Sequence, residues 1–371
     1  MDDKRPDVRL VEHASLQGVF ILGRGGRRFD IEIRDGRFAS ISDSASGAVD
    51  GDLWISPGLI DLHTHLAWTD FHHADQLRRA PAEVENLQSL AFEATIRAGV
   101  TTVRDAGGLN RDAAGRLVER SHHPLRVLVA GVTRNEQEMK EAVQSGAAWI
   151  KILATGGLGA PRETVMAPLF SRERFRNLVH AAHTLGVKVF VHTWGGATVD
   201  WAIEAGVDSV EHGIYLTAEQ AGRMAEAGIP LVPTAAIYRL LSEPKGFLDP
   251  GPLFRERAAY AAEAHRSAVS VALREGVRIG FGTDFATPAL HGRNMLELDA
   301  LADYGLPWDE AWRAATVTGA EILGLGRELG CIRDGHVADA LLFSVDPLKT
   351  TSAGELSCHL VSLLVGDPGT G

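Results

Sequence analysis

The chain has 371 residues, of which 45% are hydrophobic, so it can bury a sizeable core in one large domain or two ordinary ones. Its 37 lysines and arginines against 48 aspartates and glutamates give a formal net charge of −11. Because this charge repels phosphate groups and anionic lipid, we expect neither nucleic acid nor a membrane surface as a partner. Two cysteines, Cys331 and Cys358, are too few for a disulfide framework or a thiolate metal site. The polar N-terminal segment lacks the apolar run of a signal peptide, which predicts a cytoplasmic protein.

The first 56 residues have the pattern of short antiparallel strands. Residues 18–22, 28–34 and 37–41 alternate apolar and polar side chains, and glycine or Asp-Gly pairs separate them. Such alternation with turn residues between the runs is typical of strands that bury one face. We therefore expect a small β region at the N-terminus.

From Pro57 onward, short apolar runs alternate with helix-like stretches, for example residues 82–98, 171–185 and 255–275. Eight such runs occur, at residues 58–65, 101–107, 126–131, 149–155, 188–193, 209–213, 230–235 and 278–284. Strands that alternate with helices pair in parallel, and eight such units close a barrel. The fold class that we predict is therefore α/β, with a (β/α)8 TIM barrel over residues 57–329.

Beyond the eighth run the pattern changes back to strands. Two helix-like stretches, residues 294–304 and 308–323, precede strand-like segments at 335–343 and 359–365. We expect residues 1–56 and 330–371 to form one small β-sandwich domain beside the barrel.

Polar side chains recur where the predicted barrel strands end. The first strand ends in Asp61-Leu-His63-Thr-His65, and because residues two apart on a strand share a face, His63 and His65 both point into the barrel mouth. The other strands contribute Lys151 (fourth), His192 (fifth), His212 (sixth) and Asp284 (eighth). Imidazole and carboxylate ligands without cysteine suit Zn²⁺ best, and Mn²⁺, Co²⁺ and Fe²⁺ remain open.

Lys151 requires a separate explanation, because an ammonium group cannot bind a metal and its burial beside cations is unfavourable. Reaction of the amine with CO₂ gives an anionic carbamate whose two oxygens can bridge two metals. The alternative is a lysine that extends to the barrel rim and pairs with a carboxylate.

Nearly the whole chain resembles the amidohydrolase superfamily. The similar segments include residues 57–65, 99–105, 150–157, 210–213 and 282–284. Within the superfamily the chain is most similar to imidazolonepropionase-like proteins, Xaa-Pro dipeptidases and ochratoxin-degrading amidases. The resemblance implies a binuclear centre in which one metal is held by His63, His65 and Asp284. His192 and His212 would hold the other metal, and carbamylated Lys151 would bridge the two.

The resemblance also bears on the reaction and the substrate. Deaminases of the superfamily usually have a glutamate three residues after the strand-five histidine, whereas His192 is followed by Thr193-Trp-Gly-Gly196. The resemblance therefore argues against a deaminase. Relatives that cleave dipeptides often carry a carboxylate-binding tyrosine where this chain has Trp194. Arg162, Tyr238 and His291 are further candidate substrate contacts, and ordinary loop surface is the alternative for each.

These residues predict a metal-dependent hydrolase, a metallopeptidase-like enzyme that cleaves an amide or peptide bond near the C-terminus of a small or modified peptide. Two cations would acidify water and polarise the carbonyl group. Asp284 would move the proton to the departing amine, and His212 or His291 would help to polarise the carbonyl. Two alternatives remain: hydrolysis of a cyclic amide, lactone or other natural-product amide, and an inactive binding scaffold. We also expect a homo-oligomer.

Overall fold

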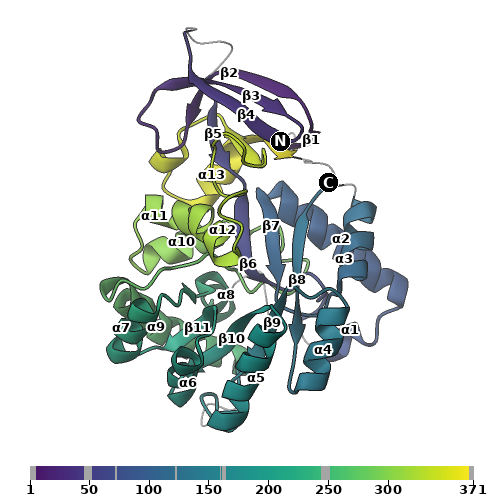
Figure 1. The fold of residues 1–371 in the computed structure, drawn as a ribbon, viewed down its shortest axis with the longest axis vertical. Helices are drawn as coiled ribbons and strands as arrows, with labels where there is room; N and C mark the ends of the chain where they lie inside the picture. The colour runs from purple at the N-terminus through teal and green to yellow at the C-terminus, as the bar shows by residue number, and fades with distance from the viewer. Residues whose placement is uncertain are drawn as a thin grey trace.

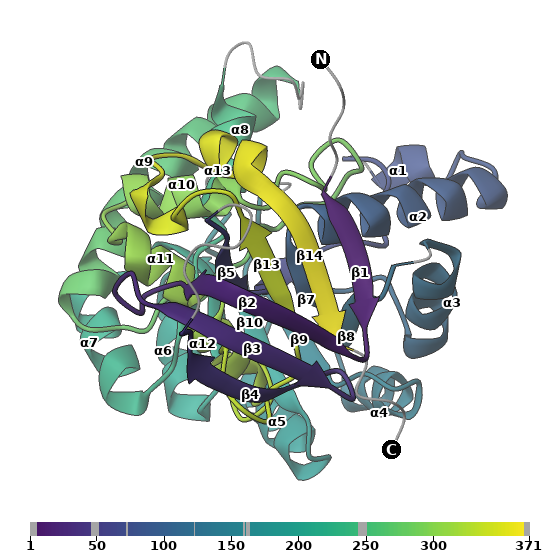
Figure 2. The same cartoon turned by 90° about the horizontal axis from the view of Figure 1, so that it is seen from above.

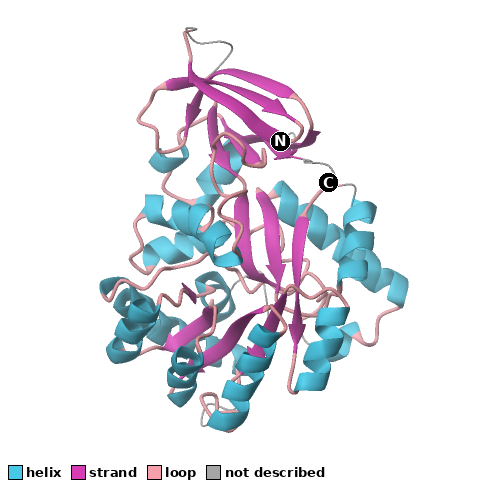
Figure 3. Ribbon diagram, viewed as in Figure 1, coloured by secondary structure: helices cyan, strands magenta, loops and turns pink. Residues whose placement is uncertain are grey.

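The computed structural model describes residues 6–45, 52–71, 73–121, 123–158, 160, 164–243 and 251–366, and it contains two separate seven-stranded sheets (Figures 1 and 3). The strands of one sheet pair in parallel, each beside its neighbour in the chain. These strands are β6 (Leu59–Thr64), β7 (Val100–Asp105), β8 (Arg126–Val132), β9 (Trp149–Leu153), β10 (Lys188–Gly195), β11 (Ser209–Tyr215) and β12 (Leu231–Val232). The predicted α/β barrel is confirmed.

The eighth predicted strand is an extended segment rather than a regular strand. It hydrogen-bonds to both edges of the parallel sheet: Gly280 N donates to Leu231 O (2.8 Å), and Leu62 N donates to Phe281 O (2.9 Å). Asp284, at the end of the segment, has a left-handed backbone with φ of 54°, which interrupts the extended geometry. Residues 278–284 thus close the barrel as predicted, but through isolated bridges.

Helices surround the parallel sheet (Figures 1 and 3). They are α1 (His73–Gln76), α2 (Pro81–Arg97), α3 (Arg111–Ser121), α4 (Glu136–Gln144), α5 (Arg172–Thr184), α6 (Ala197–Ala205), α7 (Ala218–Ala227), α8 (Ala235–Ser242), α9 (Pro252–Arg274), α10 (Leu296–Asp303), α11 (Trp308–Ala314) and α12 (Val317–Leu323). The single helix that we expected over residues 308–323 is wrong. It is broken at Thr316, whose φ of −131° and ψ of −89° lie outside the helical region.

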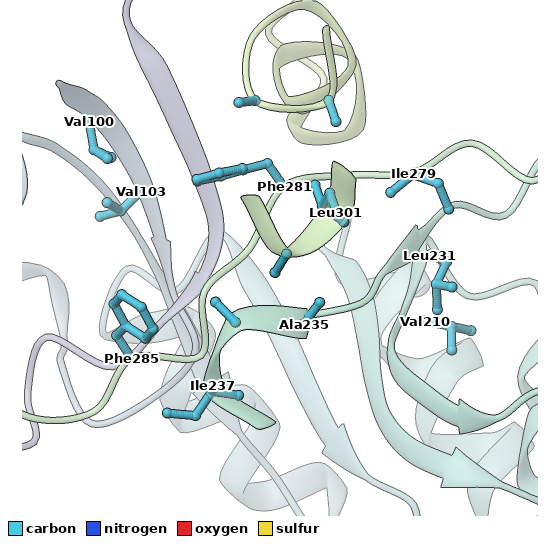
Figure 4. Packing of buried hydrophobic residues seen from close by; sticks show 14 of the residues in the cluster. Val100, Val103, Val210, Leu231, Ala235, Ile237, Ile279, Phe281, Phe285 and Leu301 are labelled. Atoms are coloured by element: carbon cyan, nitrogen blue, oxygen red, sulfur yellow. The ribbon is translucent and has the colours of Figure 1, made fainter. Parts of the chain in front are cut away.

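Apolar side chains of the strands and helices form the main core. Figure 4 shows part of it, with Val103 of β7, Val210 of β11 and Leu231 of β12 among the buried residues. The barrel interior is also filled, by residues such as Leu62, Trp149 and Phe190. The barrel is therefore a packed scaffold that fixes the strand ends, as such barrels are generally.

The second sheet is built from both ends of the chain. Its strand order is β1-β14-β13-β5-β2-β3-β4. The bounds are β1 (Asp7–Val11), β2 (Ala14–Ile21), β3 (Arg28–Arg34), β4 (Arg37–Asp43), β5 (Trp54–Pro57), β13 (Ala340–Phe343) and β14 (Leu360–Gly366). Figure 2 shows β2, β3 and β4 crossing over β13 and β14, and side chains such as Ile31, Phe38 and Leu364 share one core. One folded sheet thus supplies the two layers of the expected sandwich.

The C-terminal strands differ from the expected segments in length. Within residues 335–343 only β13 is a strand, and Val337 makes an isolated bridge to Arg37. A short 3-10 helix (Pro347–Lys349) and helix α13 (Ala353–His359) precede β14 and were not expected.

Asp339 connects the two sheets at the end of the barrel where the strands begin. Its carboxylate accepts a 2.6 Å hydrogen bond from Arg126, the first residue of β8, and its carbonyl accepts one from Gly58 N (2.9 Å). The barrel mouth therefore opens at the opposite end, away from the small sheet (Figure 1). Among the described residues, no helix is long and apolar enough to cross a membrane.

Candidate metal centre

The strand ends bring together all six residues that the sequence predicted as metal ligands. His63 is on β6 and His65 follows it; Lys151 is on β9, His192 on β10 and His212 on β11. Asp284 ends the extended eighth segment, whose backbone runs beside His63: Thr283 N donates to His63 O over 3.0 Å. Gly282 permits this approach, because a Cβ there would lie 3.0 Å from that of His63 and 2.5 Å from a methyl group of Val232.

One half of the cluster surrounds the Lys151 amine. Nζ of Lys151 lies 3.2 Å from Nε2 of His63 and 3.2 Å from Nε2 of His65. Oδ1 of Asp284 lies 3.4 Å from each of the same two nitrogens. Two imidazole nitrogens, an amine and a carboxylate oxygen therefore converge on one point.

The other half of the cluster is formed by His192 and His212, whose ring centroids are 4.5 Å apart. The His212 ring is also 5.1 Å from that of His63, which joins the two halves. Candidate ligand atoms of His63, His212 and Asp284 all lie within 4.8 Å of one another, a spacing that suits a single bound ion.

Hydrogen bonds fix which ring nitrogen faces the cluster. Nδ1 of His63 lies 2.6 Å from Glu211 Oε2, and Nδ1 of His65 lies 3.2 Å from the Gly107 carbonyl oxygen. Because these acceptors require a proton on Nδ1, Nε2 of each ring keeps its lone pair. In His192 the order is reversed, since Nε2 donates to the Gly156 carbonyl (2.7 Å) and Nδ1 is left as the possible ligand.

The tautomer of His212 is fixed in a similar way, by the hydroxyl group of Thr234. The Thr234 hydroxyl donates to the Pro233 carbonyl (2.5 Å), so it must accept the proton on Nδ1 of His212, 2.7 Å away. Nε2 of His212 is buried and has no hydrogen-bond partner among the described residues. A buried nitrogen lone pair without a partner is unfavourable unless a ligand occupies the position.

Burial keeps the imidazoles neutral. It lowers the pKa of His63 and of His212 well below the usual value, and it lowers the pKa of His192 to about 4. Burial likewise lowers the pKa of the Lys151 amine. Although burial opposes it, the neighbouring side chains of His63, His65 and Lys151 hold the pKa of Asp284 below its usual value. Neutral imidazoles beside a carboxylate are the protonation states that metal binding requires.

Backbone strain is concentrated at this site. His212, Thr234 and Asp284 have φ values of 68°, 58° and 54°, in the left-handed region that non-glycine residues seldom adopt. His212 and Asp284 are candidate ligands, and the hydroxyl group of Thr234 hydrogen-bonds to Nδ1 of His212. Such outliers cluster at functional sites, where the surrounding structure maintains them.

The donor set fits divalent metals. Imidazole and carboxylate groups from several strands, an orphaned lone pair on His212 and the absence of thiolates at the cluster match Zn²⁺ or a similar ion. The roles of the individual residues in metal binding stay predictions.

Several residues that support the cluster were not among the predicted site residues. Glu211 contacts His63, and Arg104 contacts Glu211 (2.9 Å). Asp61 accepts hydrogen bonds from Thr283 Oγ1 (2.7 Å) and Asn294 Nδ2 (2.9 Å), which ties the first strand to the eighth segment. No local pattern in the sequence distinguishes these residues from ordinary buried polar groups.

The predicted substrate contacts lie at different depths. Trp194 is 3% exposed, and its ring is 5.7 Å from that of Tyr238, which in turn is 6.0 Å from the His212 ring. His291 is buried, with Nδ1 3.4 Å from Thr95 Oγ1. Arg162 lies outside the described residues. Trp68, which we did not predict, is half-buried with its ring 5.0 Å from the His65 ring.

The barrel carries a cluster of candidate metal ligands at its strand ends, and comparison with known proteins identifies the family. The family described as "Amidohydrolase family" matches residues 54–366, and this chain belongs to it. The predicted resemblance is thereby confirmed. At the level of the family, the prediction of a hydrolase that acts on carbon–nitrogen bonds is also confirmed.

Individual relatives are distant. An uncharacterized protein of Mycobacterium tuberculosis is 28% identical over 335 residues, which is 85% of each chain. Ochratoxinase of Aspergillus niger is 30% identical over 224 residues, 59% of this chain and 45% of that protein. Imidazolonepropionase of Acidiphilium cryptum is 27% identical over 348 residues, 81% of each chain.

Solved structures share the fold over almost the full length. A prolidase complexed with N-methylphosphonate-L-proline superposes with a TM-score of 0.84 at 23% identity, covering 96% of this chain and 98% of the prolidase. The Aspergillus niger ochratoxinase structure gives a TM-score of 0.81 at 20% identity, covering 96% and 95%. At these identities the likeness establishes the fold.

Proposed function

We propose that this protein is a binuclear metal-dependent amidohydrolase, with Zn²⁺ as the metal that its ligands fit best. His63, His65 and Asp284 would hold one ion. His192 and His212 would hold the other, and carbamylated Lys151 would supply a ligand to both. The observation that carries the proposal is the position of the Lys151 amine, 3.2 Å from Nε2 of both strand-one histidines.

The carbamate explains how a buried lysine can occupy this position. Lys151 is 4% exposed, and burial lowers the pKa of its amine, which favours the neutral form that reacts with CO₂. The new N–C bond converts the amine into an anion, and the released proton passes to solvent. A carboxylate-like group among neutral imidazoles completes a ligand set suited to two divalent cations.

The residues around the cluster support hydrolysis of an amide. Bound divalent metals would supply the positive charge that acidifies water and polarises a carbonyl group. Asp284, with 24% of its side chain exposed at the mouth, accepts the proton of the attacking water and delivers it to the departing amine. We assign the further polarisation of the carbonyl to His291, because one ring nitrogen of His212 faces Thr234 and the other is directed at the metal.

We propose a small or modified peptide as the substrate, cleaved at an amide near its C-terminus. Prolidase and ochratoxinase, both similar to this chain in fold, support an amide substrate of this size. The aromatic side chains of Trp68, Trp194 and Tyr238 near the cluster favour an apolar or aromatic group beside the amide. Trp194 also keeps the alternative of a cyclic amide, lactone or other natural-product amide open.

The test is a substrate screen under controlled metal content. Chelator-treated protein, with and without added Zn²⁺, is assayed against Xaa-Pro and Xaa-Arg dipeptides, N-acyl aromatic amino acids, cyclic imides and lactones. The proposal expects zinc-dependent hydrolysis of at least one amide class. Zinc-dependent hydrolysis of lactones alone would favour the alternative, and absence of any turnover with zinc bound would favour a binding scaffold.

A further inference from the structure

Three buried side chains from three different strands form a continuous polar row that ends at the proposed metal centre. They are Arg104 of β7, Glu211 of β11 and His63 of β6, and each is 0% exposed. Charged residues are almost never fully buried unless they are paired. The contacts of Arg104 and Glu211 must therefore compensate for the burial of their charges.

Both carboxylate oxygens of Glu211 are occupied. Oε1 accepts hydrogen bonds from Ser209 Oγ (2.6 Å) and Arg104 Nη2 (2.9 Å), while Oε2 faces Nδ1 of His63 at 2.6 Å. Because Ser209 and Arg104 hold Oε1, the carboxylate group cannot rotate freely, and Oε2 stays directed at the imidazole of His63.

Arg104 is itself rigidly held. Its Nε donates to the Leu62 carbonyl (2.6 Å), and its guanidinium carbon lies 4.1 Å from the ring centroid of Phe190 and 4.5 Å from that of Trp149. Leu62 immediately precedes His63 in β6, so the guanidinium group connects the backbone of that strand to the carboxylate which holds its histidine.

From this geometry we infer that Glu211 is a positioning residue for the metal centre, anchored by Arg104, which holds His63 with Nε2 directed at the metal. The inference rests on the proposed function. Carboxylates that hydrogen-bond a metal-binding histidine fix its ring and tautomer, and their loss typically lowers metal affinity about 10- to 100-fold.

A purely structural role explains the row less well. A buried ion pair is weak evidence for stability, because the cost of removing two charges from water offsets much of their attraction. An ion pair that only neutralised Arg104 would not need its second oxygen on a histidine of the candidate centre. Arg126 and Asp339, 2.6 Å apart at the other end of the barrel, form a pair without such a contact, in which Arg126 is partly exposed, and they serve as the control for an ion pair remote from the centre.

The experiment separates the two roles with a double variant. Glu211→Gln alone leaves Arg104 as an unpaired buried cation, so it should lower both the stability of the metal-free protein and its zinc affinity. Adding Arg104→Met removes the cation. Zinc affinity is measured by competition with a chelating dye, and stability by the urea midpoint of the metal-free protein.

If Glu211 positions His63, the double variant recovers much of the lost stability, yet its zinc affinity stays at least about 10-fold below wild type. Recovery of wild-type zinc affinity in the double variant would overturn the inference. The control Asp339→Asn with Arg126→Met should leave zinc affinity within about 2-fold of wild type. A wild-type protein that binds no zinc would instead refute the proposed function.

The wild-type protein gives a second readout that does not depend on the stability of the Glu211 variants. In ¹⁵N-histidine spectra of the metal-free protein at neutral pH, His63 should be the Nδ1–H tautomer, with a proton protected from exchange by Glu211. Assignment comes from the resonance lost in His63→Gln. A predominant Nε2–H tautomer would overturn the inference.

Discussion

Nζ of Lys151 lies 3.2 Å from Nε2 of His63, although both side chains are buried. The contact joins the fourth strand to the first across the barrel. Since the His63 proton is on Nδ1, the lone pair on Nε2 points toward the lysine. Under the proposed function, carbamylation of this amine would place an oxygen ligand beside His63 and His65.

Substitution of Lys151 by alanine should therefore remove metal binding and activity together. We expect Lys151→Ala to retain well under one zinc per chain and to lose nearly all turnover, because two separate half-sites would remain without their bridge. Elemental analysis and an amide hydrolysis assay measure the two effects. Added acetate or formate should restore part of the activity by supplying a replacement carboxylate.

Lys188 provides the control for this substitution. It is half-buried at the start of β10, where its Nζ donates to the Ile322 carbonyl (2.8 Å), away from the mouth. Lys188→Ala should keep full metal content. Two bound metals and normal turnover in Lys151→Ala would contradict the bridging role.

Asp284→Asn should separate chemistry from metal binding. The amide keeps an oxygen ligand but cannot accept and return a proton, so we expect a modest loss of metal and a rate at least about 100-fold lower. Turnover of the zinc-saturated variant is the relevant measurement. If a saturated variant turned over normally, Asp284 would be a ligand alone.

Trp194→Tyr should change substrate preference. Trp194 lies on the same face of β10 as His192 and contacts Tyr238, whose ring is next to His212. We expect wild type to hydrolyse free Xaa-Pro and Xaa-Arg dipeptides poorly, and the hydroxyl of the variant to improve them relative to blocked aromatic amides. The ratio of kcat/KM for the two substrate classes measures this preference. Efficient dipeptide cleavage by wild type, unchanged in the variant, would make Trp194 a packing residue.

His192 should titrate far below an ordinary histidine in the metal-free protein. Burial, and then the positive charge of Lys151, lower its pKa from 6.5 to about 4. In the unfolded chain the ring gains its proton near pH 6.5, so its contribution to stability is present above that pH and is lost as pH falls toward 4. Titration of the His192 ring by ¹⁵N NMR measures the pKa directly.

A variant isolates the consequence for stability. Between pH 6.5 and 4, the unfolding free energy of metal-free wild type should fall by up to about 1.4 kcal/mol per pH unit more than that of His192→Asn. Urea unfolding at several pH values gives both slopes. Equal slopes for the two proteins, or a His192 titration near pH 6.5, would contradict this assignment.

The sequence predicted the parts of the fold that follow from periodicity. The positions of His63, His192 and His212 at strand ends required only that apolar runs alternate with helices. The eighth strand was harder, because its pairing is irregular and the left-handed backbone of Asp284 has no signature in the sequence. The break at Thr316 was missed because threonine, unlike glycine or proline, lowers helix propensity too little to mark a break.

The contacts of the supporting residues could not be predicted, for a related reason. Glu211 and Arg104 lie on strands that are neither consecutive nor adjacent, and a sequence does not show which buried carboxylate will face which cation across a barrel. Thr234 likewise reaches His212 from a residue with strained geometry just after β12. Such contacts depend on the three-dimensional register of the whole barrel.

Metal-dependent amide hydrolysis at the barrel mouth is the central proposal for this protein. The most direct test is the hydrolysis rate of chelator-treated protein as a function of added Zn²⁺, in bicarbonate-containing buffer, on an amide identified by the screen. We predict a negligible rate without zinc and a rise that saturates near two ions per chain. A rate that is the same before and after metal removal, and insensitive to added zinc, would contradict it.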